Sequence, residues 1–134
     1  MKIPFLDLGA SYRELKLEID TAITRVLNSG WYILGPEVEA FEAEWAEYCK
    51  AQHAVGLANG LDALTLALRA LDIGPGDEVI VPPRTFIATA SAVAMLGARP
   101  VFADIDPESG NISAETIAAV ITPETRAIIA CLLY

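Results

Sequence analysis

Apolar residues recur every three or four positions in the first part of the chain, which is the spacing of a helix with one buried face. Between Ser11 and Leu27 they are Leu15, Ile19, Ile23 and Val26. Ser11 and Glu14 have the spacing of a capping box, so we expect this helix to begin at Ser11 and to end near Leu27. Pro36 suits a first helical position and begins a second predicted helix, whose apolar stripe is Phe41, Trp45 and Tyr48.

After His53 the pattern changes to short apolar runs that alternate with helical ones. The runs 53–57, 78–82, 100–105 and 126–133 predict strands, and 62–71, 85–96 and 113–121 predict helices. Strands that alternate with helices indicate an α/β fold, in which a mostly parallel sheet with right-handed crossovers is flanked by helices. We therefore expect an N-terminal helical segment with a connector at 1–52 and an α/β region at 53–134.

Composition limits the classes of partner. With 134 residues, of which 54% are hydrophobic and 20% charged, the chain is expected to fold as an ordinary globular domain. A net charge of -9 disfavours nucleic acid and anionic membranes as partners. No apolar run approaches the roughly 20 residues that span a bilayer. Cys49 and Cys131 are far apart in the sequence, which indicates reduced thiols and a cytoplasmic protein.

The segment Asn59-Gly60-Leu61-Asp62 separates a predicted strand from a predicted helix. Asn-Gly is typical of a hairpin turn, but Leu64, Leu68 and Leu71 continue at helical spacing. The free N–H groups at a helix start suit a phosphate, and Gly60 permits close approach because it has no Cβ. A simple capped turn stays open as an alternative, and the Asp62 carboxylate would repel a phosphate unless it points away. The spacing is neither G-x-G-x-x-G nor a P-loop, which leaves a small cofactor with one phosphate.

A second helix start follows Pro82-Pro83, with Phe86 near its beginning. An aromatic ring at such a rim could stack on a planar heterocycle. The alternative is that Phe86 belongs to the core.

Three stretches together resemble the N-terminal part of a known family. They are "ILGPEVEAFEAEWAEYC", "ANGLDALTLALRALDIGPGDEVIVPPRTFIATASAVAMLGARPVFADIDPESGNI" and "ITPETRAII". Their order and spacing are similar to those of the DegT/DnrJ/EryC1/StrS family, the sugar aminotransferases that depend on pyridoxal 5′-phosphate (PLP). The resemblance implies a type I aminotransferase fold, whose large domain has a mostly parallel seven-stranded sheet, and it implies a homodimer. The region 53–134 would be the first part of that large domain.

The same resemblance implies roles for particular residues. Backbone amides of Gly60, Leu61 and Asp62 would hold the cofactor phosphate, with the Asp62 amide rather than its carboxylate facing the cofactor. Phe86 would stack on the pyridine ring, and the connector with Trp31 and Tyr32 would lie near the mouth of the active site. The implied reaction transfers an amino group, from glutamate, to a nucleotide-linked keto sugar.

The sequence departs from the family pattern in what it lacks. Its lysines are Lys2, Lys16 and Lys50, and none has the context of the lysine that binds the cofactor covalently. That lysine and the carboxylate beside the pyridine nitrogen are expected beyond Tyr134. We therefore assign no catalytic residue and no metal site to this chain. To Asp104 and Asp106 we assign structural roles. The chain is expected to be a truncated piece that is inactive alone. Its Ala130, Cys131 and Leu132 stand where the family commonly has a proline, a small apolar residue and a histidine.

Two other functions stay open. A deoxysugar dehydratase of the same family would have a histidine in place of the lysine. A truncated, non-catalytic module could self-associate through the uncharged segment "AIIACLL" at 127–133.

Overall fold

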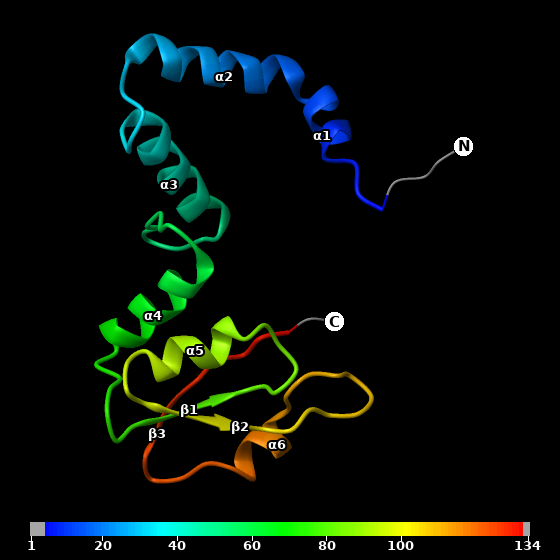
Figure 1. Ribbon diagram of the computed structural model, residues 1–134, viewed down its shortest axis with the longest axis vertical. Coiled ribbons are helices and arrows are strands. Elements are labelled where there is room, and N and C mark those ends of the chain that lie inside the picture. The colour runs from blue at the N-terminus through cyan, green and yellow to red at the C-terminus, as the bar shows by residue number, and fades with distance from the viewer. Residues whose placement is uncertain (1–4, 133–134) are drawn as a thin grey trace. The chain divides into compact units, whose positions relative to one another are not determined.

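The computed structural model describes residues 5–132, which fold as two compact units (Figure 1). The N-terminal unit comprises residues 1–56 and the α/β unit residues 57–134. The division into functional parts at 52/53 stays a prediction. In residues 5–132 there is no helix with the length and apolar character needed to cross a membrane.

Three helices form the N-terminal unit: α1 (Leu8–Glu14), α2 (Lys16–Ser29) and α3 (Pro36–Tyr48). The predicted start at Ser11 is wrong, because α1 begins after Asp7 and Ser11 lies inside it. The chain leaves helical geometry at Leu15, whose φ of -100° and ψ of 15° divide the predicted single helix into α1 and α2. Gly30 ends α2 in the left-handed conformation (φ 69°), which glycine adopts without a steric penalty.

Helix α3 begins at Pro36 as predicted. Its aromatic side chains form a continuous row, with ring centroids 5.8 Å apart for Phe41 and Trp45 and 5.6 Å apart for Trp45 and Tyr48. All three rings are exposed, so the predicted stripe exists but is not a core. The Arg25 guanidinium makes a two-point ion pair with Glu37, which ties α2 to the start of α3 and holds the pKa of that carboxyl below its usual range.

The α/β unit contains a three-stranded parallel sheet in the order β2-β1-β3. Its elements are α4 (Gly60–Ala70), β1 (Glu78–Val81), α5 (Ala88–Ala94), β2 (Arg99–Phe102), α6 (Ala114–Ala118) and β3 (Thr125–Ile128). The strand expected at 53–57 is wrong, since that segment is irregular. The strand expected at 126–133 begins at Thr125 and ends at Ile128, and Leu133 lies outside the described residues.

The two crossovers run in opposite directions from the central strand. The chain moves from β1 outward to β2, and then returns past β1 to β3. Right-handed crossovers in opposite directions place their helices on opposite faces of a sheet. Figure 1 agrees, because α5 and α6 lie on opposite sides of the strands.

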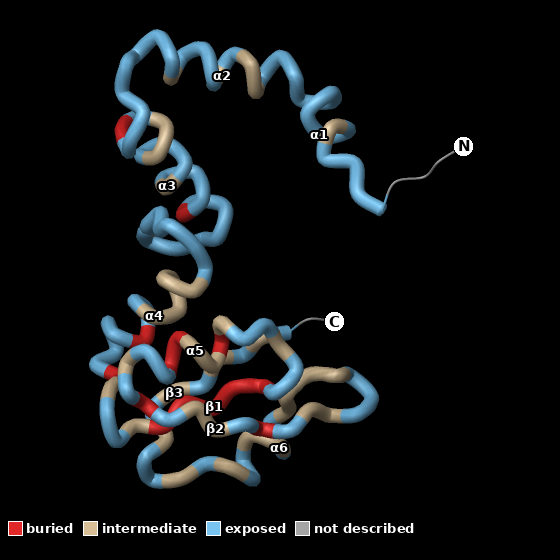
Figure 2. The backbone as a smooth tube through the Cα atoms, in the orientation of Figure 1, coloured by how far each residue is buried: buried red, intermediate tan, exposed pale blue. Residues whose placement is uncertain are grey.

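The core of the α/β unit surrounds β1. Val79, Ile80 and Val81 have no exposed surface, as expected for a central parallel strand covered on both faces (Figure 2). Helix α5 packs on β1 and β2, and α4 packs on α5. The buried apolar cluster consists of Leu68, Ile73, Val79, Val81, Ala92, Val93 and Ala98. This core fixes the starts of α4 and α5, which carry the residues of the candidate site.

Candidate functional site

Asn59 is the N-cap of α4 and not part of a hairpin turn. Its backbone is extended (φ -163°, ψ 170°), and its Oδ1 accepts a hydrogen bond from the Asp62 amide at 2.9 Å. Its Nδ2 donates a hydrogen bond to Asp62 Oδ2, also at 2.9 Å. This reciprocal cap holds the Asp62 carboxylate against Asn59, and it already uses the Asp62 amide.

The two amides between Asn59 and Asp62 are not used by this cap. The N–H groups of Gly60 and Leu61 have no hydrogen-bond partner among the residues that the structure describes. A Cβ built on Gly60 would meet no described atom within 4 Å, so the space in front of this backbone is open. These donors lie at the positive end of the α4 dipole, where an anionic group is favoured.

Phe86 precedes α5 in the segment after β1. The predicted helix start at Thr85 is wrong, because α5 begins at Ala88. The Phe86 carbonyl accepts a hydrogen bond from the Thr89 amide at 3.1 Å. The Phe86 side chain is 75% exposed, which contradicts the alternative that it belongs to the core. An exposed ring next to a helix start is available to a planar ligand.

One open pocket of about 470 Å³ joins these two helix starts. Its lining consists of Asn59, Gly60, Leu61, Leu64, Thr85, Phe86, Ala88, Thr89 and Cys131. The structure therefore brings Gly60, Leu61 and Phe86 together, whereas Asp62 is not part of the lining. Since Thr85 follows β1 and Cys131 follows β3, the pocket lies at the carboxyl edge of the sheet, where α/β folds bind ligands.

Among the lining residues to which the sequence assigned no role in the site, three carry a hydroxyl or thiol group: Thr85, Thr89 and Cys131. Thr85 Oγ1 lies 3.0 Å from Thr89 Oγ1 and donates a hydrogen bond to Cys131 Sγ at 3.1 Å. The sequence signal that could have identified them is the position of each at a strand or helix end on the same edge of the sheet.

The pocket supplies binding groups rather than groups for proton transfer. Its lining contains backbone donors, an aromatic ring, hydroxyl groups and a thiol. Residues 57–134 contain no lysine. The arrangement can hold an anionic group at the start of α4 and a planar ring against Phe86.

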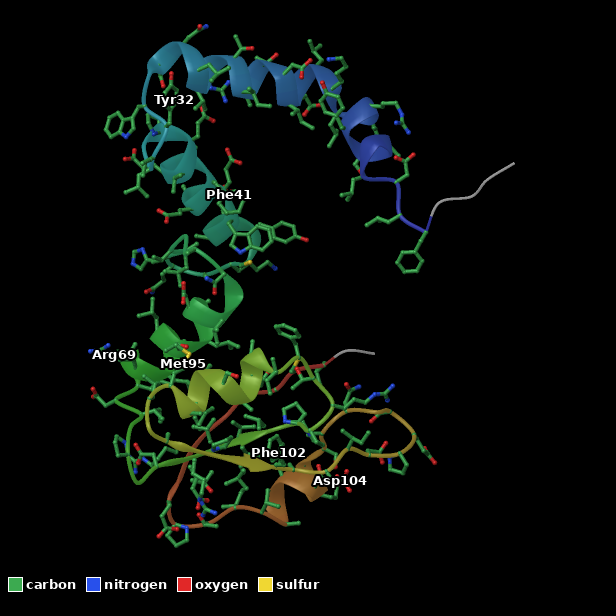
Figure 3. All side chains as sticks on the ribbon, viewed as in Figure 1. Tyr32, Phe41, Arg69, Met95, Phe102 and Asp104 are labelled. Carbon is green, nitrogen blue, oxygen red and sulfur yellow. The ribbon has the colours of Figure 1, made fainter. Side chains whose placement is uncertain are left out.

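Asp104 and Asp106 follow β2 and serve the backbone (Figure 3 labels Asp104). Asp106 Oδ1 accepts hydrogen bonds from the amides of Ser109, at 2.8 Å, and Glu108, at 3.1 Å. These donors, Ser109 first, hold the pKa of Asp106 below its usual range. Within residues 5–132, no group of histidine, cysteine and acidic side chains is arranged to hold a metal ion.

The connector with Trp31 and Tyr32 is held by its own hydrogen bonds. Trp31 Nε1 donates to the Ile33 carbonyl at 2.7 Å, and the Tyr32 hydroxyl donates to the Leu27 carbonyl at 3.2 Å. Both rings line a pocket of about 330 Å³ within the N-terminal unit. Their expected place near an active-site mouth stays a prediction.

The fold and the pocket define a class of protein: an α/β protein with a parallel sheet between helices, whose candidate ligand pocket lies at two helix starts on the carboxyl edge of that sheet. Residues 13–134 match the DegT/DnrJ/EryC1/StrS aminotransferase family, and the chain belongs to this family. The resemblance inferred from the sequence is thereby confirmed.

Two curated relatives illustrate the similarity. The chain is 53% identical over 133 residues to a dTDP-3-amino-3,4,6-trideoxy-alpha-D-glucose transaminase of Streptomyces venezuelae, covering 99% of this chain and 35% of the relative. It is 48% identical over 132 residues to a UDP-2-acetamido-2-deoxy-3-oxo-D-glucuronate aminotransferase of Pseudomonas aeruginosa, covering 98% of this chain and 37% of the relative. The chain thus spans about a third of the length of these relatives.

Solved structures show the same fold. DesV of S. venezuelae has a TM-score of 0.90 and 54% identity, covering 95% of this chain and 34% of that one. NtdA of Bacillus subtilis, solved with bound cofactor PMP, has a TM-score of 0.86 and 35% identity, covering 95% of this chain and 29% of that one. The chain therefore forms part of the large domain of the type I aminotransferase fold, as expected from the sequence.

Proposed function

We propose that the protein to which this chain belongs is a PLP-dependent aminotransferase that transfers an amino group from glutamate to a nucleotide-linked keto sugar. We further propose that it works as a homodimer in the cytoplasm. The names of the relatives, which are transaminases of nucleotide-linked sugars, support the substrate class. The free thiols of Cys49 and Cys131 support the location.

The observation that carries the proposal is the single pocket that joins free backbone donors to an exposed aromatic face. A phosphate and a planar ring are the two recognisable parts of PLP, and the pocket offers a partner for each. The open space in front of Gly60 fits a phosphate that approaches the backbone closely. PLP supplies, when bound, the electron sink for amino-group transfer.

Each of these residues has a binding role in this proposal. The Gly60 and Leu61 amides donate hydrogen bonds to the phosphate, while a hydrogen bond from Asn59 Nδ2 holds the Asp62 carboxylate at the cap. The Asp62 amide, assigned to the phosphate from the family resemblance, is already bonded to Asn59 Oδ1, so its role stays a prediction. Phe86 covers one face of the pyridine ring and excludes water from it.

The chain's part in the reaction is therefore binding and orientation. The lysine and the carboxylate that complete the chemistry are proposed to come from the remaining two thirds of the protein, since relatives of this family are about three times as long as this chain.

A binding experiment on the 134-residue chain tests the cofactor site. Pyridoxamine 5′-phosphate is the suitable probe, because it has no aldehyde and cannot react with Lys2, Lys16 or Lys50. Gly60→Val should weaken its binding by about 10-fold or more, since charge-assisted hydrogen bonds are each worth about 1.5–3 kcal/mol. Gly74→Val is the matched control, because a Cβ on Gly74 also meets no described atom within 4 Å. Equal affinities in both variants would contradict the site.

An activity experiment on the full-length protein tests the reaction. Incubation with glutamate and a nucleotide-linked keto sugar should yield the amino sugar and 2-oxoglutarate. Loss of water from the sugar without transfer of nitrogen would instead support the dehydratase alternative. Sedimentation of the full-length protein tests the proposed homodimer.

A further inference from the structure

Thr85 begins the turn that carries Phe86, and its hydroxyl group is held on two sides. Its Oγ1 donates a hydrogen bond to Cys131 Sγ at 3.1 Å, and it lies 3.0 Å from Thr89 Oγ1. Because the Thr85 proton is directed to the sulfur, the Thr89 hydroxyl is the donor of the second bond. The three side chains form a directed chain of hydrogen bonds from α5, through the turn, to the residues after β3.

Thr89 anchors this chain in the core. Its residue is 4% exposed, and its amide donates to the Phe86 carbonyl at 3.1 Å. A β-branched side chain in a buried helical position has few rotamers, so its hydroxyl is a fixed point. At the other end of the chain of hydrogen bonds, Cys131 lies two positions after Ile129, whose amide donates a hydrogen bond to the Ile80 carbonyl of β1 and so ties this segment to the sheet.

The Phe86 ring has no comparable support of its own. It is 75% exposed, and residues 83–87 form neither helix nor strand. The position of the ring therefore depends on how firmly the backbone of this turn is held. Any disorder in the turn has to be lost when a planar ligand stacks on the ring, which weakens binding.

We propose that Thr85 is a positioning residue for the cofactor ring: its hydroxyl, held between Thr89 and Cys131, fixes the turn so that Phe86 remains at the pocket wall. This inference rests on the proposed cofactor site. It assigns to the hydroxyl–hydroxyl–thiol chain a role in ring binding that is separate from phosphate binding at Gly60 and Leu61.

Two probes separate these roles. Thr85→Val keeps the shape of the side chain and removes the hydroxyl. It should weaken the binding of pyridoxamine 5′-phosphate by about 2- to 10-fold, the range expected for a lost aromatic stack, as measured by calorimetry. The binding of inorganic phosphate should be unchanged, because the α4 amides are untouched. Thr85→Ser, which retains the hydroxyl, should restore the affinity for the full cofactor.

A double-mutant cycle tests whether Thr85 acts through the ring. In a Phe86→Ala background, Thr85→Val should cause no further loss of affinity for pyridoxamine 5′-phosphate. Losses that add fully would overturn the proposal, since they would show that Thr85 acts independently of Phe86. The proposal would also be overturned if Thr85→Val weakened the binding of inorganic phosphate as much as the binding of pyridoxamine 5′-phosphate, because that result indicates a general structural effect.

A second pair of variants guards against misfolding. They are used if Thr85→Val lowers the melting temperature severely. Cys131→Ala removes the acceptor of the hydrogen bond from Thr85, whereas Cys131→Ser retains an acceptor. Cys131→Ala should weaken cofactor binding more than Cys131→Ser does. Wild-type affinity in both Thr85→Val and Cys131→Ala would overturn this inference alone. Absence of pyridoxamine 5′-phosphate binding by the wild-type chain would overturn the cofactor site together with the inference.

Discussion

The carboxylate of Glu78 and the hydroxyl of Thr122 are joined by a hydrogen bond of 2.7 Å across 44 positions of sequence. Glu78 is 2% exposed at the start of β1, and Arg99 at the start of β2 forms an ion pair with its other oxygen. The two contacts connect the amino ends of the strands with the turn before β3. This edge of the sheet is opposite the pocket, so its role is stability.

Thr122→Val should destabilise the α/β unit by about 1–3 kcal/mol, because it leaves one buried carboxylate oxygen without its hydroxyl donor. The measurement is urea unfolding followed by circular dichroism. Thr65→Val is the matched control, since within residues 5–132 the Thr65 hydroxyl bonds only to the Leu61 carbonyl of its own helix. A cost no larger than that of the control would show that Arg99 alone satisfies Glu78.

Asn59→Ala should lower the free energy of unfolding by about 0.5–2 kcal/mol, the usual cost of removing an N-cap side chain. The change removes the acceptor for the Asp62 amide and the donor for its carboxylate. Asn59→Ser keeps an acceptor for the amide and should recover most of the loss. If serine were no better than alanine, the hydrogen bond to the Asp62 carboxylate would be the more important of the two.

The carboxyl of Asp106 should titrate below its ordinary value of 3.8, because the Ser109 amide, then the Ser109 hydroxyl and the Glu108 amide, stabilise its charged form. A depressed pKa contributes stability that is present above the unfolded value and is lost as pH falls through the folded value. Carboxyl carbon shifts in an NMR titration measure it directly. Ser109→Ala should retain most of the shift, since the largest contribution comes from the backbone; return of the pKa to its ordinary value would contradict this cause.

Gly97→Ala should destabilise the protein by at least about 1 kcal/mol, because φ is 75° there and an L-residue pays for the left-handed conformation. Its Cβ would also lie 3.1 Å from Cγ of Pro75. In a Pro75→Ala background the cost of Gly97→Ala should fall, and the difference measures the steric part. An undiminished cost in thermal unfolding would assign the whole effect to the backbone.

The parts of the fold that were predictable are those that depend on local chemistry. Pro36 begins α3 as predicted, and Ser113, the first residue of a predicted helix, caps α6, where its hydroxyl accepts a hydrogen bond from the Thr116 amide. Each of these residues acts through neighbours no more than four positions away. Ser11 also has the local sequence of an N-cap, but it is not one. Helix α1 begins three residues earlier, after Asp7, so Ser11 lies inside it.

The errors concern features that depend on distant partners. The segment 53–57 has an apolar pattern, yet a strand exists only where its backbone pairs, and the described residues provide no such pairing. The helix predicted from Thr85 starts at Ala88, and the Thr85 hydroxyl bonds to Cys131, 46 positions later. Gly60 and Phe86 could be predicted as parts of the pocket because each stands at a helix start that the local sequence indicates. The hydrogen-bonded group of Thr85, Thr89 and Cys131 could not be predicted, because it depends on a contact between distant segments.

The order β2-β1-β3 has a consequence for synthesis on the ribosome. Both neighbours of β1 follow it in the chain, so neither side of this strand can be paired when it emerges. At 5–20 residues per second, the interval between completion of Val81 and of Ile128 is about 2–10 s. During that time β1, the most apolar strand of the unit, lacks at least one of its two neighbouring strands, since β2 is complete only at Phe102 and β3 only at Ile128. The period in which β1 lacks a neighbour, and is at greatest risk of aggregation, therefore ends only when β3 has been translated.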